Sequence, residues 1–279
     1  MKNNIILMLK GAVFGVANII PGVSGGTIAL TMGVYEDFIS SISNFLKKPK
    51  KSLKFLLPFG IGAALSILLM SKLISFCLDK FPLPTTLFFV GLILGGVPLL
   101  TKKVRKKKVK KTNLGLFALT FSIVMLMFFM KSGNNLVNLA NPNLLMYLIL
   151  GLVGMIAAAT IIIPGVSGSF VLMLLGFYEP IVNTVGDLTN FSNLGHNLLI
   201  LVPFGLGVVL GMILIAKLIE YLFKKYEIPT YYAILGFVIA SIITLVIGAF
   251  STKIILAHLL VGIITLAVGT LAGYKLGDE

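Results

Sequence analysis

The chain has 279 residues, of which 58% are hydrophobic and 11% are charged, and its mean hydropathy is +1.06. A soluble domain carries about 25% charged residues, so this composition excludes a soluble globular protein and indicates an all-α chain that spans a membrane several times. The net charge of +14 comes from basic residues that gather in short loops, which is typical of charge-oriented membrane proteins, so no nucleic-acid partner is expected.

The first expected element is a broken helical segment over residues 5–44, interrupted at 19–27 by the sequence IIPGVSGGT. The half before Pro21 is about 24 Å long at 1.5 Å per residue, which is short of a hydrocarbon core of roughly 30 Å. Pro21 removes a backbone donor, and the glycines after it tolerate positive φ. These features predict a re-entrant hairpin whose tip lies at membrane depth, buried in protein or lining a wet cavity.

The remaining expected elements are six full spans and a second broken segment. Three spans are expected near 53–78, 84–101 and 114–131, with a basic loop at 102–111, and then a second broken segment at 144–182 and three spans near 198–223, 229–250 and 254–275. Cys77 is the single cysteine and the two histidines have no companion cluster, so no disulfide, metal site or cofactor is expected.

The chain contains an internal sequence repeat. The phrase IIPGVSGGT returns 143 residues later as IIPGVSGSF at 162–170, and LLPFGIG at 56–62 returns 145 residues later as LVPFGLG at 201–207. We therefore expect one integral membrane domain, 1–279, built from repeats 5–131 and 148–275. A repeat of this length in a membrane protein indicates a duplicated transporter fold.

The number of spans decides the relation between the repeats. If each broken segment enters and leaves on one side, three full spans follow, and three is odd, so the second repeat is expected upside down relative to the first. Most of the 23 basic residues, including the loop 102–111, then fall on the side of the N-terminus. The positive-inside rule makes this side cytoplasmic and places both termini inside.

The two phrases are expected to form a shared substrate site. Ser24 is expected as the N-cap of the outgoing helix, and free amide donors at a helix start favour an anion. Inversion brings both tips to the membrane midplane, where transporters hold their substrates. The expected substrate-binding residues are Gly22, Ser24, Gly25, Gly26, Thr27, Gly165, Ser167, Gly168 and Ser169. The alternative is that these small residues only permit close helix packing.

Two further residue pairs occupy matching positions. Glu36 and Glu179 follow the outgoing half-helices, either as proton-coupling carboxylates or as interfacial acids at a helix end. Lys72 and Lys217 lie within expected spans, where they either neutralise a phosphate or extend their ammonium groups to the interface.

The paired PGVSGGT and PGVSGSF, the following GVYE and GFYE, and PFG in each half resemble the PopT-type polyprenyl-phosphate translocases over nearly the whole chain. The resemblance implies a transporter, not an enzyme, that returns undecaprenyl phosphate from the outer to the inner leaflet of the bacterial cytoplasmic membrane. This recycles the lipid carrier for peptidoglycan and other envelope polymers. Its partners are the lipid substrate and membrane lipids; a homo-oligomer, the coupling ion and the chain length stay open.

Two other functions are weighed against this one. Undecaprenyl-pyrophosphate phosphatases also use inverted repeats with re-entrant helices, but phosphate hydrolysis favours an arginine clamp and an activated nucleophile. The one arginine, Arg105, lies in the basic loop. A transporter or channel for a small soluble anion fits the same pair of tips.

Overall fold

The computed structural model describes residues 2–20, 23–105, 109–130, 137–139, 142–187, 193–251 and 255–278. Within these ranges the regular structure is entirely helical. The helices of the first half are α1 (Lys2–Ile19), α2 (Gly25–Thr31), α3 (Tyr35–Ser43), α4 (Pro49–Lys80), α5 (Pro82–Val104) and α6 (Lys111–Phe129). Those of the second half are α7 (Leu144–Ile162), α8 (Gly168–Leu174), α9 (Tyr178–Gly186), α10 (Leu194–Lys225), α11 (Glu227–Phe250) and α12 (Leu256–Asp278).

Seven of the described helices are long and apolar enough to cross a membrane: α4, α5, α6, α7, α10, α11 and α12. The bent pair α8 and α9 makes an eighth span if it is counted as one. The six full spans expected from the sequence are confirmed as helices whose ends differ from the expected ones by a few residues. The chain is a multi-pass membrane protein.

The broken segments have one more interruption than the sequence analysis expected. The outgoing helices α2 and α8 are only seven residues long, and each is followed by a glycine with positive φ, Gly33 (+70°) or Gly176 (+74°). Glycine adopts this conformation without the steric cost that a Cβ brings. The chain turns there into α3 or α9, and the bend between α8 and α9 is 115°.

Close helix packing depends on glycines at matching places in the two halves. In α1 and α4, a Cβ on Gly11 would collide with the carbonyl oxygen of Phe59. In α7 and α10, a Cβ on Gly154 would collide with that of Phe204. Small residues let membrane helices approach backbone to backbone, so α1 packs on α4 in the way that α7 packs on α10.

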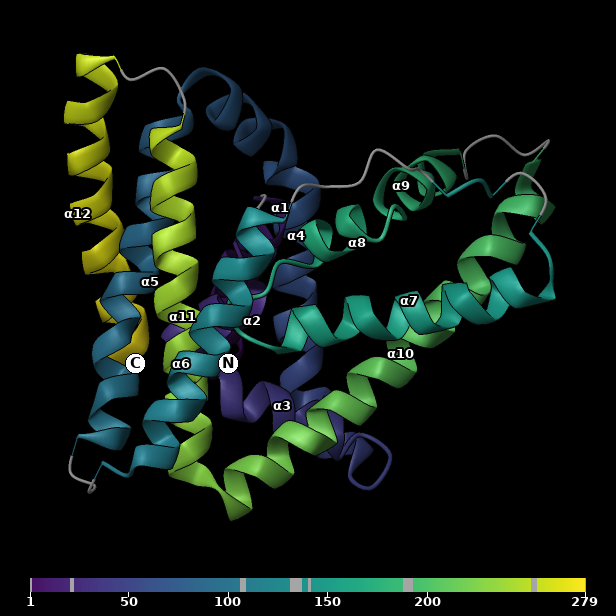
Figure 1. Ribbon diagram of the computed structural model, residues 1–279, viewed down its shortest axis with the longest axis horizontal. Helices are drawn as coiled ribbons and strands as arrows, with labels where there is room; N and C mark the ends of the chain where they lie inside the picture. The colour runs from purple at the N-terminus through teal and green to yellow at the C-terminus, as the bar shows by residue number, and fades with distance from the viewer. Residues whose placement is uncertain are drawn as a thin grey trace.

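The long helices exchange partners between the halves. Helix α5 packs along α12, and α11 packs along α6, while α5 and α11 also contact each other. In Figure 1 the start of α5 and the end of α11 lie toward the top, whereas the end of α5 and the start of α11 lie toward the bottom. The two helices are therefore antiparallel.

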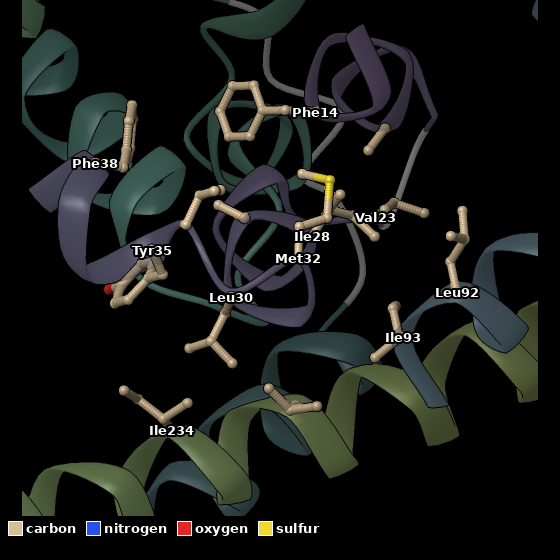
Figure 2. Close-up of a cluster of buried hydrophobic side chains, with 14 of the residues drawn as sticks. Phe14, Val23, Ile28, Leu30, Met32, Tyr35, Phe38, Leu92, Ile93 and Ile234 are labelled. Carbon is tan, nitrogen blue, oxygen red and sulfur yellow. The ribbon is translucent and has the colours of Figure 1, made fainter. Parts of the chain in front are cut away.

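The main apolar core surrounds α2. Figure 2 shows Ile28 of this helix and Met32, which directly follows it, among side chains from neighbouring helices, with Phe14 on α1 and Leu92 and Ile93 on α5. All seven residues of α2 are buried, whereas α8 has no buried residue. The first broken segment is thus docked in the core, and the second is not.

Candidate functional site

The two helix-breaking phrases meet in the folded chain. We call residues 19–27 tip one and residues 162–170 tip two; positions 21 and 22 lie outside the described residues. The backbone N–H of Gly165 donates to the hydroxyl of Thr27 at 2.6 Å, and the hydroxyl of Ser24 donates to the carbonyl of Ile163 at 3.4 Å. The hydroxyl of Tyr35 donates to the carbonyl of Ile162 at 2.9 Å.

These bonds have a common cause in the end of α7. The last carbonyls of a helix have no partner within the helix, and Pro164 has no N–H to offer them a turn. Hydroxyls from the first half satisfy two of these carbonyls, at Ile162 and Ile163. The buried polar backbone of tip two is therefore completed by side chains of tip one and α3.

Tip one is closed by protein. Ser24 occupies the N-cap position of α2 but makes no side-chain capping bond, because its hydroxyl goes to tip two instead. Ser24 and Thr27 are 2% and 0% exposed, and Gly25 and Gly26 are also buried. A Cβ on Gly26 would lie 2.8 Å from the carbonyl oxygen of Ile162. In this conformation a ligand has no access to these residues.

Tip two lines a cavity of about 350 Å³, which we call the second-tip cavity. Ser167 and Ser169 lie 3.1 Å apart, oxygen to oxygen, and both line it. Helix starts and ends supply the rest of the wall: Pro82 and Thr86 of α5, Val124, Met127 and Phe128 of α6, Gly165, Val166, Phe170 and Met173 of the second broken segment, and Thr244, Leu245, Gly248 and Ala249 of α11. Four hydroxyls stand in an otherwise apolar lining, and no described residue that lines it is charged.

The other expected residues that the structure describes do not line this cavity. Gly22 falls outside the described residues, and Gly168 begins α8 beside the hydroxyl of Thr160. Lys72 and Lys217 are exposed on α4 and α10, line none of the described cavities, and make no hydrogen bond or ion pair with a described residue. The structure does not bring these lysines to the tips.

The two expected glutamates differ from each other. The carboxylate of Glu36 accepts a hydrogen bond from the hydroxyl of Tyr231 and lies 3.4 Å from the ammonium of Lys103. Glu179 is exposed and has no such partner within the described part of the chain. Both glutamates lie in the first turn of their helix, and Glu36 also joins α3 to α5 and α11.

Sequence reasoning missed Lys10. Its side chain is 5% exposed, and its ammonium donates to the carbonyl of Met32 at 2.9 Å. Met32 caps the C-terminal end of α2, where a cation is favourable. The position of Lys10 inside the apolar run of 5–20 was the signal in the sequence. Thr86 and Thr244 were also missed, because they reach the second-tip cavity only through the fold.

The cavity chemistry suits a ligand with a small polar head and an apolar body. Ser167 and Ser169 offer hydroxyl donors, and the surrounding methyl, thioether and phenyl groups offer apolar contact. Within the described residues no group of three or more histidine, cysteine or acidic side chains is placed to hold a metal ion.

Comparison with known proteins shows the family of the chain. The model of the undecaprenyl phosphate translocase-like family matches residues 14–258. A polyprenyl-phosphate transporter of Staphylococcus aureus (strain NCTC 8325 / PS 47) is 32% identical over 98% of this chain and 95% of its own length. One of Vibrio cholerae serotype O1 (strain ATCC 39315 / El Tor Inaba N16961) is 29% identical over 86% and 77%. No solved structure matches. Both relatives are named as transporters and not as enzymes, and the chain belongs to the undecaprenyl phosphate translocase-like family.

Proposed function

We propose that this protein carries undecaprenyl phosphate from the outer to the inner leaflet of the bacterial cytoplasmic membrane. The names of its family and relatives support the substrate class. The observation that carries the proposal is the second-tip cavity, in which four hydroxyls interrupt an apolar wall. A lipid monophosphate must move a charged head through hydrocarbon while its tail stays in lipid, so it needs donors at depth beside an apolar opening.

In this proposal the phosphate contacts Ser167 and Ser169, and Gly165, which lines the same cavity, allows the backbone to approach it. Hydrogen bonds to a charged acceptor are about twice as strong as neutral ones, so hydroxyl and amide donors compensate for the absence of a charged side chain among the described lining residues. Tip one, from Gly22 to Thr27, takes the same role in the opposite state, when its contacts with tip two have opened.

In an inverted repeat the two halves can exchange conformations, which gives the state in which tip one is open. The matching glycine contacts of α1–α4 and α7–α10, and the antiparallel α5 and α11, support two repeats of opposite orientation. Transport then proceeds by rocking of the broken segments around the paired tips near the midplane. In this proposal the side that carries the basic segments 47–54 and 102–111 faces the cytoplasm, with both termini inside, as the positive-inside rule favours.

The lining of the cavity favours this substrate over a small soluble anion. A free anion has no apolar part, and a lining with no charged side chain gives it little reason to leave water. Lys72 and Lys217, the cations proposed to neutralise a phosphate, point to no cavity in the present state. They would contribute only if the helices that carry them rearrange.

Proton coupling through Glu36 and Glu179 is part of the proposal. A carboxylate that is desolvated in one state and solvated in the other exchanges a proton between them. Translocation that is unchanged by collapse of the proton gradient, and by Glu36→Gln with Glu179→Gln, would remove this part and leave the rest.

The test uses liposomes that contain the purified protein and labelled undecaprenyl phosphate. We expect Ser167→Ala with Ser169→Ala to lower the translocation rate about tenfold or more, because two donors to a charged group are lost. Ser251→Ala is the control, since this exposed serine ends α11 outside the cavity lining. A double variant that has the same unfolding temperature as the native protein and also the same translocation rate would contradict the proposed site. No translocation by the native protein would contradict the function.

A further inference from the structure

A second cavity, of about 280 Å³, lies at the other end of α5, and we call it the Lys103 cavity. Leu30 from α2, Leu99 and Leu100 from α5, and Tyr231 from α11 line it together with Lys103 and Glu36. Thr86, in the second-tip cavity, and Lys103 are 17 positions apart on one helix, which corresponds to about 25 Å along its axis. The two cavities therefore open at opposite ends of the same pair of helices, α5 and α11.

The two cavities are built from equivalent positions of the repeated sequence. With the offsets of 143 and 145 residues, five residues of the Lys103 cavity correspond to five of the second-tip cavity: Leu30 to Met173, Leu99 to Thr244, Leu100 to Leu245, Lys103 to Gly248, and Tyr231 to Thr86. If the second-tip cavity is one mouth of the path, its equivalent is the other mouth. The chemistry differs at three of these positions, because Leu99, Lys103 and Tyr231 stand where the second-tip cavity has Thr244, Gly248 and Thr86.

The Lys103 cavity already holds an anion, supplied by the protein itself. The Glu36 carboxylate accepts from the Tyr231 hydroxyl and pairs with the Lys103 ammonium, which also lies 5.8 Å from the centre of the Tyr231 ring. These donors are the ones that a phosphate monoester would use. Asp37 also lines the cavity. Because Glu36 already pairs with Lys103, a phosphate gains from Lys103 only after Glu36 has left it.

We propose that Lys103 and Tyr231 form a second phosphate site, at the mouth beside the basic loop 102–111, and that Glu36 occupies this site until the lipid phosphate displaces it. The proposal rests on the proposed function. Displacement of Glu36 frees α3 from α5 and α11, and α3 carries Tyr35, which ties tip one to the end of α7. Arrival of the phosphate at this mouth is thereby linked to the opening of tip one.

The decisive comparison is between Lys103→Met and Glu36→Gln, because both break the same ion pair. If the pair only holds α3 in place, both variants change phosphate binding in the same direction. If Lys103 and Tyr231 bind phosphate and Glu36 competes, the two variants diverge. We expect Lys103→Met to weaken binding of farnesyl phosphate about tenfold, Tyr231→Phe to weaken it less, and Glu36→Gln to strengthen it severalfold.

Binding is measured with the full chain in lipid nanodiscs, and again in the Ser167→Ala, Ser169→Ala background so that the second-tip cavity does not contribute. Lys275→Gln is the matched control, since it removes an exposed lysine from the last turn of α12 outside the cavity. Thermal unfolding of each variant separates a lost site from a lost fold, and Tyr231→Phe provides a second route if Lys103→Met unfolds.

Two failures are distinguishable. A native protein that neither binds farnesyl phosphate nor translocates undecaprenyl phosphate overturns the proposed function and this inference together. A native protein that does both, with Lys103→Met and Glu36→Gln changing binding alike or not at all, overturns the second site alone.

Discussion

Tip one and tip two share the sequence Pro-Gly-Val-Ser-Gly, but their surroundings differ. Helix α2 packs against α1, α3, α5, α7 and α12, whereas α8 packs chiefly against α7 and α9. The Tyr35 hydroxyl is bonded to the other tip, while the equivalent Tyr178 is half-buried and its hydroxyl makes no bond within the described residues. One motif is docked and its copy stands open at a cavity.

The difference lies in the helix that receives each tip. Gly96 on α5 is so close to Thr31 of α2 that a Cβ there would collide with it. The equivalent position on α11 is Ser241, which is 1% exposed and whose hydroxyl has no hydrogen-bond partner within the described residues. A serine in place of a glycine obstructs the close approach that α8 would need. We infer that the receiving helices, and not the shared phrase, decide which tip is docked.

The largest expected effect comes from holding the open tip in place. Met173 and Leu245 both line the second-tip cavity, from α8 and α11. In a Cys77→Ser background, Met173→Cys and Leu245→Cys joined by a short cleavable reagent should reduce translocation more than tenfold, because α8 can no longer move relative to α11. Cleavage of the reagent should restore the rate, and the single-cysteine variants serve as controls. Native rates in the joined protein would show that the two tips do not alternate.

Exchanging the receiving positions should change the docking itself. Gly96→Ser should destabilise the docked tip by about 1–3 kcal/mol, the usual cost of overpacking, and lower the unfolding temperature. Ser241→Gly should instead favour docking of tip two, which is measured as slower thiol labelling of Ser169→Cys in the Cys77→Ser background. Equal labelling with and without Ser241→Gly would remove position 241 from the explanation.

A smaller effect separates the two tyrosines. Tyr35→Phe leaves the buried Ile162 carbonyl without its partner and should cost about 1–3 kcal/mol of unfolding free energy. Tyr178→Phe should stay within about 0.5 kcal/mol. Denaturant or thermal unfolding of both variants, side by side, measures the difference. Equal losses would mean that the two tyrosines have equivalent surroundings in solution.

Much of this fold follows from local signals in the sequence. Proline inside an apolar run fixed where α1 and α7 end, and long apolar stretches located the six full spans. The second breaks, at Gly33 and Gly176, also had a signal in the glycine before each aromatic-acid pair, but no break was expected there. The sequence does not show whether a glycine has a positive φ or an ordinary helical φ.

The candidate site was harder to predict because it depends on contacts between distant segments. The meeting of the tips around Thr27 and Gly165 could be expected from symmetry. The closed state of tip one could not, since two nearly identical phrases carry no information about which is buried. Lys103 and Tyr231 are 128 positions apart, and only the packing of α5 on α11 brings them to one carboxylate.

The length of α10 has a consequence for the surrounding lipid. Its 32 apolar-rich residues extend about 48 Å, against a hydrocarbon core of roughly 30 Å, and it runs obliquely to α11 in Figure 1. A helix longer than the core tilts to fit, and the tilt it adopts depends on bilayer thickness. Helix α10 packs on α7, and tip two follows the end of α7. The length of the lipid acyl chains, which sets the tilt of α10, therefore also affects the position of tip two. Activity should therefore pass through an optimum as the membrane is thickened.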